Sequence, residues 1–223
     1  MRRNVKFLVP LTMIATMVWS SGSEAFFFGL PRALKYQFAR IELDSPMLPP
    51  IGHSRFCLRY PDDCKVHGID FRRRDITLTE QRWAELNDVN RQVNRDIVAE
   101  VTPGNGTFEE WLIAPPAGDC KDYAITKRHE LLARGWPSRT LLLSEVIVPD
   151  GQHHLVLVVR IKDGDLVLDN LNANIRPATL TFRQYQWVRI ETPQNPKLWA
   201  RVRQPAATMH AVASNDRDAH GDI

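Results

Sequence analysis

The chain has 223 residues, of which 43% are hydrophobic and 25% are charged. This length fits a single domain with tails. Its 29 Lys and Arg are nearly balanced by 26 Asp and Glu, giving a formal net charge of +3. Binding to nucleic-acid phosphates requires a concentrated basic surface, so this balance excludes nucleic acid as the main partner.

The first 25 residues have the order of a secretory signal peptide. Three basic residues precede an apolar stretch at residues 7–19, and Ser23-Glu24-Ala25 provides small residues at the cleavage positions. The apolar stretch has 13 residues, fewer than the ~20 that a membrane-spanning helix needs. Three phenylalanines at 26–28 extend it, so an uncleaved membrane anchor is the alternative. We expect a periplasmic or secreted protein with a net charge of about +1 after cleavage.

Residues 26–56 are rich in proline and aromatic side chains and show no sustained periodicity. We interpret residues 26–43 as an extended N-terminal arm and residues 44–204 as the folded domain. Residues 205–223 are small and polar, which predicts a disordered tail.

The first predicted helix covers residues 77–100. Apolar side chains recur there at spacings of three and four, which is typical of a helix with one buried face. They are Trp83, Leu86, Val93 and Ile97, with Val89 or Asn90 at the position between Leu86 and Val93. Thr77 and Glu80 have the spacing of a capping box, so we expect the helix to begin there.

The second predicted helix covers residues 120–134 and begins at a cysteine. Asp119 is suited to the N-cap position, and Gly135 with Pro137 ends the helix. Cys120 then lies beside unpaired backbone N–H groups at the positive end of the helix dipole. Such an environment stabilises a thiolate, and it can lower the pKa of a cysteine from ~8.5 to roughly 3.5–7.5.

After Pro137 the residue pattern indicates strands instead of helices. Leucine-rich and β-branched runs follow each other at residues 139–148, 153–161 and 164–170, separated by the turn sequences Pro149-Asp150-Gly151 and Asp163-Gly164. Residues 185–190 and 198–203 add two shorter strands. Helices followed by a meander of strands predict an α+β fold with an antiparallel sheet. The long apolar runs indicate that the sheet is covered on at least one face.

Three cysteines leave one unpaired in an oxidising compartment. Cys57 and Cys64 flank a proline-containing loop, so we predict a disulfide between them. A zinc site of Cys57, Cys64 and His67 is the alternative, although the sequence offers no evident fourth ligand. Either assignment leaves Cys120 as the odd thiol. A lone cysteine is most often a small buried side chain.

A nucleophilic thiol needs a base, and the base needs an acceptor that orients it. His154 begins one predicted strand and Asp169 ends the next. If the two strands pair around the turn at Asp163, the start of one lies beside the end of the other. This predicts a His154–Asp169 pair near Cys120, with His153 on the opposite face of the strand as the alternative base.

These residues resemble the bacterial transglutaminase-like cysteine peptidases, a family of the papain-like and transglutaminase-like superfamily. The similarity rests on "GDCKDYA" (118–124), "HLVL" (154–157) and "LVLDN" (166–170), and more weakly on "RWAELNDVNRQVN", "FCLRYPDDC" and "NPKLWARV". It covers roughly residues 44–204. The resemblance implies a papain-like or transglutaminase-like fold, in which the helix that begins at the catalytic cysteine packs on a C-terminal antiparallel sheet.

The resemblance further implies a Cys120–His154–Asp169 triad that hydrolyses a peptide bond through a thioester. The substrate is then a protein or peptide, such as the surface adhesins that better-known relatives release. Those relatives have a calcium site around the cysteine, and here Asp119 and Asp122 could supply two weak contacts to a calcium ion. Lys121 replaces the usual acidic residue, so we expect no required cofactor. The alternatives are acyl transfer to an amine, as in an amidase or transglutaminase, and a non-catalytic peptide-binding module.

Overall fold

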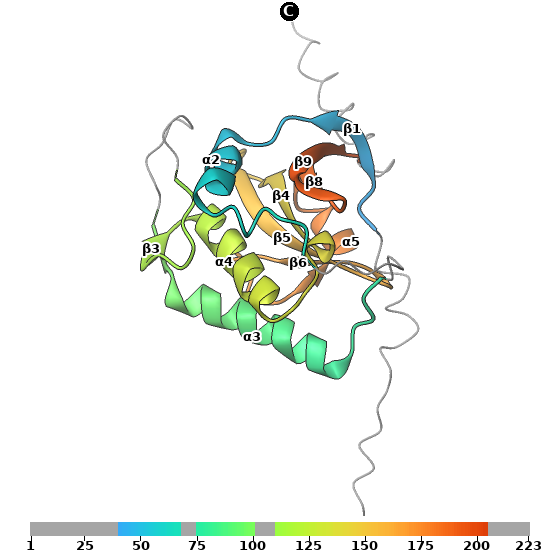
Figure 1. Cartoon of the computed structure of the whole chain (residues 1–223). Helices are drawn as coiled ribbons and strands as arrows, with labels where there is room; N and C mark the ends of the chain where they lie inside the picture. The colour runs from blue at the N-terminus through green and yellow to red at the C-terminus, as the bar shows by residue number, and fades with distance from the viewer. Residues whose placement is uncertain (1–39, 68–74, 101–109, 205–223) are drawn as a thin grey trace, which may run out of the picture. The chain divides into compact units, whose positions relative to one another are not determined.

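The computed structural model describes residues 40–67, 75–100 and 110–204 (Figure 1). The predicted signal peptide, the predicted arm up to residue 39 and the predicted tail lie outside these residues. Within the described part of the chain, every helix is too short or too polar to cross a membrane.

Four α-helices and a seven-stranded antiparallel sheet make up the described fold. The helices are α2 (Ile51–Arg59), α3 (Glu80–Asp96), α4 (Cys120–Ala133) and α5 (Ala178–Thr181), with a 3-10 turn η1 (Ser138–Thr140). The strands, in spatial order, are β1 (Leu43–Met47), β9 (Asn195–Val202), β8 (Gln186–Thr192), β4 (Leu141–Ile147), β5 (His153–Ile161), β6 (Gly164–Leu168) and β7 (Arg176–Pro177). A separate parallel pair consists of β2 (Val98–Ala99) and β3 (Ala117–Gly118). The predicted α+β class is confirmed.

The sheet departs from a simple meander after β7. Strands β4 to β7 pair consecutively, but the chain then crosses to the other side of β4, where β8 pairs with it. Strand β9 follows β8, and the N-terminal β1 completes that edge. The tight turns before β5 and β6 use Gly151 (φ 85°) and Gly164 (φ 140°), backbone conformations that favour glycine.

Both faces of the sheet are buried. Helix α4 packs on β5, and α3 packs on α4 on the side away from the sheet (Figure 1). This layer forms one core with side chains such as Leu86, Ile125, Leu143 and Leu157. The opposite face packs in a second core, which includes Val156, Val158, Phe182, Tyr185 and Trp187. Burial on two faces explains why β4, β5 and β6 are nearly continuous apolar runs.

The first predicted helix is confirmed, but the predicted capping box is wrong. Helix α3 begins at Glu80, and its N-cap is Thr79, whose side chain accepts a hydrogen bond from the Arg82 N–H (3.3 Å). Thr77 lies outside the helix. The helix ends at Asp96, because Val98–Ala99 pair with β3 instead of continuing the helical hydrogen bonds.

Helix α2 was not predicted from the sequence, because residues 26–56 show no sustained periodicity. The buried residues of this helix are Gly52, His53 and Phe56, so its buried face contains one large apolar side chain. Trp111, distant in sequence, packs on it, and a Cβ atom at Gly52 would lie 2.4 Å from the Trp111 Nε1 atom. Such long-range packing determines the helix and leaves little local signal.

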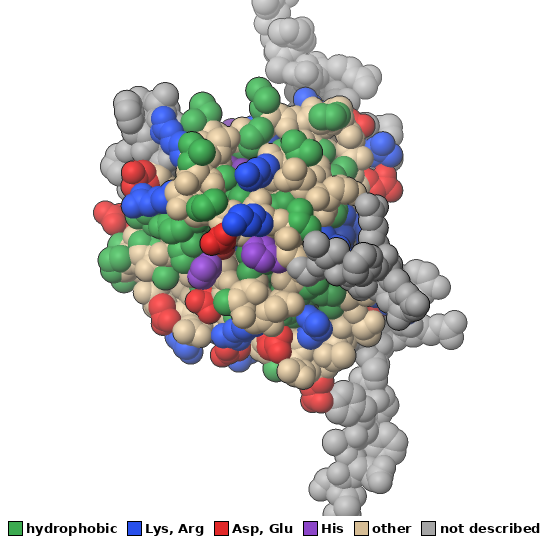
Figure 2. All heavy atoms as spheres, in the orientation of Figure 1, with side chains coloured by type: hydrophobic (Ala, Val, Ile, Leu, Met, Phe, Trp, Pro, Cys, Tyr) green, Lys and Arg blue, Asp and Glu red, His purple; other side chains and the backbone are tan. Residues whose placement is uncertain are grey.

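Charges of both signs are distributed over the visible surface. On the face shown in Figure 2, Lys and Arg side chains are interspersed with acidic and apolar ones. This face presents no continuous basic surface, in agreement with the small net charge.

Candidate active site

Cys120 is the first residue of α4 and is held by a capping box. The Asp119 side chain caps the helix, and the Asp122 carboxylate accepts the N–H groups of Asp119 (3.1 Å) and Leu112 (2.7 Å). Gly118 is required for this arrangement, because a Cβ atom there would lie 2.3 Å from an Asp122 carboxylate oxygen. Cys120 is partly buried and its thiol is free, as predicted.

His154 lies at the start of β5 and contacts both other candidate residues. Its Nε2 atom hydrogen-bonds Asp169 Oδ1 at 2.8 Å, and its side chain lines the same cleft as Cys120, which contributes to raising the pKa of His154. The register pairs Leu157 with Leu168, so residue 169 follows β6 beside the beginning of β5. The structure therefore brings Cys120, His154 and Asp169 together as the sequence predicted.

Three groups besides His154 hold the Asp169 carboxylate. The Tyr185 hydroxyl donates to Oδ2 (2.6 Å), the Leu171 N–H donates to Oδ1 (3.0 Å), and Arg176 lies 3.6 Å from Oδ2. Asn94 of α3 donates to the Asp169 backbone carbonyl (3.1 Å). Sequence reasoning missed Tyr185 and Arg176, because their approach depends on how β7 and α5 fold back against β6 and no local pattern records it.

The His154–Asp169 pair is charged at neutral pH. Burial by itself lowers the pKa of His154, but its hydrogen bonds to Asp169 and Cys120 outweigh burial and raise that pKa to about 9. Burial raises the pKa of Asp169, but the hydrogen bond and charge of His154, with Tyr185 and the Leu171 N–H, bring it below its ordinary value. Burial and the hydrogen bond to Asp169 raise the pKa of Tyr185 to about 12, so its hydroxyl stays a donor.

A buried lysine lies on the same helix as Cys120. Lys127 follows Cys120 by seven residues, which places both on one face of α4. Its side chain is 1% exposed. Burial lowers the pKa of Lys127 to about 7, although the nearby Asp169 charge acts in the opposite direction. The interior of the protein therefore disfavours its charged form.

A cleft of about 100 Å³ opens at the thiol. Its lining consists of Pro50, Trp111, Cys120, Lys121, Glu145, His153, His154 and Leu155. His153, the alternative base, pairs with Glu145, and 65% of its side chain is exposed. His154 rather than His153 has the contacts to Cys120 and Asp169.

A second cavity of about 540 Å³ shares Trp111 as a wall and adds Arg55, Phe56, Leu58, Arg59 and Glu110.

The carboxylates next to Cys120 do not fit a calcium site as they are arranged. Lys121 forms an ion pair with Asp119 Oδ2 (2.6 Å), and the other Asp119 oxygen accepts the Lys121 N–H (3.1 Å). Both oxygens of Asp122 accept backbone N–H groups. Calcium requires six to eight oxygen ligands, and these four oxygens already have partners. That the protein needs no calcium stays a prediction.

The predicted disulfide between Cys57 and Cys64 is confirmed. The alternative zinc site with His67 is not formed, because the His67 ring is hydrogen-bonded to the Asp62 carbonyl (2.6 Å). A different histidine, His53, lies beside the sulfurs, with its Nε2 atom 3.6 Å from Cys57 Sγ.

With this geometry established, comparison with known proteins decides the family. The model of the bacterial transglutaminase-like cysteine proteinases (BTLCP) matches residues 44–207. The chain belongs to this family. As a BTLCP proteinase it is a cysteine peptidase, and its substrates are proteins or peptides. The resemblance that the sequence motifs suggested is thus confirmed.

Solved structures of Legionella pneumophila LapG are also similar to this BTLCP proteinase. One LapG structure is 27% identical with a TM-score of 0.45, and the match covers 53% of this chain and 68% of LapG. The calcium-bound LapG structure is 25% identical with a TM-score of 0.47, covering 58% of this chain and 80% of that one. No curated protein sequence matches the chain.

Proposed function

We propose that the chain is a periplasmic thiol peptidase with a Cys120–His154–Asp169 triad. In this assignment Cys120 is the nucleophile, His154 is the general base and acid, and Asp169 orients the imidazole. The observation that carries the proposal is the position of the His154 ring, which hydrogen-bonds Asp169 through Nε2 and lines the same cleft as the Cys120 side chain. A histidine placed between a thiol and a buried carboxylate is the arrangement that activates a nucleophilic cysteine.

The charged His154 supplies the proton that peptide cleavage needs. The Cys120 thiolate attacks the scissile carbonyl carbon, and the backbone N–H of Cys120 at the start of α4 stabilises the oxyanion. The imidazolium of His154 then gives its proton to the departing amine, leaving a thioester on Cys120. Water, deprotonated by His154, attacks the thioester; the acyl group leaves as the acid, and the Cys120 thiolate and the His154 imidazolium are restored. Asp169 keeps the ring in the orientation that both steps use.

The proposed location follows from the N-terminal sequence. Residues 1–25 have the features of a signal peptide, and a disulfide such as Cys57–Cys64 is typical of oxidising compartments. We further propose that the substrate is a protein of the cell surface. N-terminal sequencing of protein recovered from the periplasm tests the location, and a first residue of Phe26 is the expected result.

Alkylation by a fluorescent iodoacetamide probe tests the triad without a known substrate. We expect rapid labelling of the wild-type protein, no labelling of Cys120→Ala and strongly slowed labelling of His154→Ala. Asp169→Asn should retain part of the reactivity, because an orienting group contributes less than the base. His153→Ala is the matched control, since the neighbouring histidine pairs with Glu145. Wild-type labelling of a folded His154→Ala protein, or loss of labelling in His153→Ala, would contradict the assignment.

Proteomics then addresses the substrate. Periplasmic and surface fractions of cells with the wild-type protein should contain cleaved proteins that are intact in cells with Cys120→Ala. A cleaved surface protein is the expected difference, and identical fractions would argue against a peptidase of surface proteins.

A further inference from the structure

Helix α2 extends from the cleft at Cys120 to the second, larger cavity. Its N-cap, Pro50, lines the cleft, its last residue, Arg59, lines the cavity, and Trp111 is a wall of both. The cleft measures about 100 Å³ and the cavity about 540 Å³. Sites that select a ligand usually measure roughly 300–1,000 Å³, so the cavity has the size for selection that the cleft lacks.

The described lining of the larger cavity combines buried aromatic rings with exposed side chains. Phe56 and Trp111 are 2% and 3% exposed, and their ring centroids lie 6.4 Å apart. Leu58 is 84% exposed. Arg59, whose side chain is 53% exposed, forms an ion pair with Glu110 (3.0 Å). An apolar side chain of a ligand therefore finds aromatic partners inside the cavity and a charged group beside it.

The charges on this lining favour an acidic ligand. Arg55 and Arg59 contribute two positive charges and Glu110 one negative charge, which leaves a surplus of one positive charge among the described lining residues. The ion pair with Glu110 uses the Nη1 atom of Arg59, and a guanidinium has further N–H donors for a second carboxylate. A carboxylate beside Arg59 would neutralise the surplus and accept charge-assisted hydrogen bonds.

The solvent-exposed side of α2 carries two large apolar side chains. Ile51 is 60% exposed, and Leu58 follows it after two helical turns, which places both on one side of the helix. Ile51 comes directly after Pro50 of the cleft, whereas Leu58 lines the larger cavity. Exposed apolar side chains that continue from a catalytic cleft mark a binding surface.

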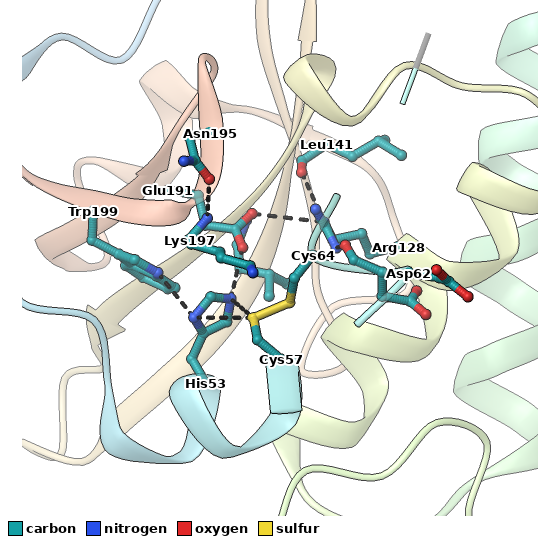
Figure 3. The surroundings of a disulfide bond; sticks show 12 residues. His53, Cys57, Asp62, Cys64, Arg128, Leu141, Glu191, Asn195, Lys197 and Trp199 are labelled. Atoms are coloured by element: carbon teal, nitrogen blue, oxygen red, sulfur yellow. Dashed lines mark hydrogen bonds and ion pairs between the residues drawn. A yellow bond between two sulfur atoms is a disulfide. The ribbon is translucent and has the colours of Figure 1, made fainter. Parts of the chain in front are cut away.

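The buried side of α2 is anchored to the core. Trp199 donates its indole N–H to His53 Nδ1 (3.3 Å), and His53 Nε2 is hydrogen-bonded to Glu191 (3.0 Å). The disulfide between Cys57 and Cys64 lies next to this ring, as Figure 3 shows. The exposed side of the helix is therefore held in a fixed position, which limits the conformational entropy that a ligand would lose from the protein on binding.

We propose that the exposed side of α2 and the larger cavity form the subsite that selects the substrate polypeptide. An apolar substrate side chain occupies the cavity against Phe56 and Trp111, and a neighbouring acidic side chain pairs with Arg59. The proposal rests on the proposed peptidase function and specifies its substrate class, which is a polypeptide with an apolar and an acidic residue near the scissile bond.

The length of α2 determines how far from the scissile bond these two residues lie. A helix rises 1.5 Å per residue, so Arg55 and Arg59 lie about 8 and 14 Å from Pro50 along the helix axis. An extended polypeptide advances ~3.3 Å per residue. The selected residues are therefore expected about two to four positions from the scissile bond, on one side of it.

Selection of a displayed library of random dodecapeptides on the Cys120→Ala protein tests the subsite without turnover. We expect the enriched peptides to carry Asp or Glu next to an apolar residue. Arg59→Lys in the same background should keep this preference, whereas Arg59→Glu should exclude acidic peptides. Arg203→Glu is the matched control, because Arg203 is likewise an exposed arginine (58%) paired with a glutamate, Glu42, at 3.0 Å and is not among the described lining residues of either cavity.

Kinetics separates binding at the subsite from catalysis. The most enriched peptide, synthesised with a fluorophore and a quencher at its ends, should be cleaved by the wild-type protein. Arg59→Gln should raise KM about 10-fold, the effect of losing one hydrogen bond to a charged group, and leave kcat nearly unchanged. The contact is made equally in the bound substrate and in the transition state, so it affects KM alone. Leu58→Ala, which changes an exposed side chain, should raise KM in the same way.

Several results would overturn the subsite while leaving the peptidase function intact. They are enriched peptides without acidic residues, an unchanged selection on Arg59→Glu, a library from which no sequence is enriched, and a reactive Cys120 that cleaves other peptides but none of the selected ones. A fall in kcat of Arg59→Gln at constant KM would also refute it, because that result indicates a structural role.

Failure of the peptidase function gives a different pattern. Acidic peptides would then bind, but Cys120 would resist iodoacetamide and no peptide would be cleaved, which refutes the assignment of the bound peptide as a substrate. Sedimentation tests the competing occupant, a second copy of the chain. A wild-type dimer that Leu58→Asp dissociates would show that the cavity is an interface between copies and would overturn the proposal.

Discussion

The charge of His154 depends on Asp169, and replacing this carboxylate by an amide should lower the pKa of the histidine. Asp169→Asn keeps the shape of the side chain but removes the negative charge next to Nε2. Burial, which by itself lowers the pKa of His154, is then opposed only by the bond to Cys120. We expect the pKa to fall from about 9 by at least one unit, toward its ordinary value of 6.5.

The size of the effect follows from the two pKa values. At pH 8 a histidine with a pKa of about 9 is roughly 90% protonated, whereas one at 6.5 is roughly 3% protonated. The raised pKa also stabilises the fold by about 3 kcal/mol, because His154 is 7% exposed and each unit corresponds to about 1.4 kcal/mol. This contribution is fully present below pH 6.5 and is lost as the pH rises through about 9.

NMR titration of the histidine Cε1–H signals measures this pKa directly, with His154→Ala assigning the signal. Asp163→Asn, an exposed aspartate in the turn of the same hairpin, is the control and should leave the titration unchanged. Urea unfolding should show Asp169→Asn destabilised at pH 6 and much less so at pH 10. A His154 pKa that stays near 9 in Asp169→Asn would refute the argument that the carboxylate sets it.

Three further predictions concern α4. Lys127→Met should stabilise the protein at pH 6 by up to something on the order of 5 kcal/mol, because burial lowers the pKa of Lys127 from 10.5 to about 7 and the charged side chain therefore destabilises the fold. This destabilisation is complete below pH 7 and fades toward pH 10.5, so urea unfolding at pH 6 and pH 10 measures it. A variant less stable than the wild-type protein at pH 6 would contradict the prediction. Gly118→Ala should lower stability by on the order of 1–2 kcal/mol and slow the alkylation of Cys120, because the new Cβ displaces the Asp122 carboxylate of the capping box. Unchanged alkylation would show that the capping box does not position the thiol. A calcium chelator should leave alkylation of the wild-type protein unchanged, whereas the Lys121→Glu variant should bind calcium detectably by calorimetry. If chelation abolished alkylation of the wild-type protein and calcium restored it, the prediction that the protein needs no calcium would be wrong.

The sequence predicted the elements whose signals are local. The helix that begins at Cys120 has its N-cap Asp119 and its terminal glycine next to it in the sequence. The His154–Asp169 contact follows from one hairpin, since a tight turn fixes the register of two adjacent strands.

Features that depend on distant partners could not be predicted in the same way. Helix α2 is formed around His53, whose contacts to Glu191 and Trp199 come from strands at the other end of the chain. Tyr185 read as the start of a strand, and only the folded position of its hydroxyl shows that it holds Asp169. The zinc alternative named His67 because it is close to Cys64 in sequence, whereas the fold places His53 at the sulfurs.

The two outer strands of the seven-stranded sheet each contain a proline, Pro46 in β1 and Pro177 in β7. Proline has no backbone N–H to donate, so neither strand offers a regular edge to which another extended chain could add. Self-association by strand addition is therefore disfavoured even where the protein is concentrated. For the same reason, docking of a polypeptide substrate by strand addition at these two edges is disfavoured.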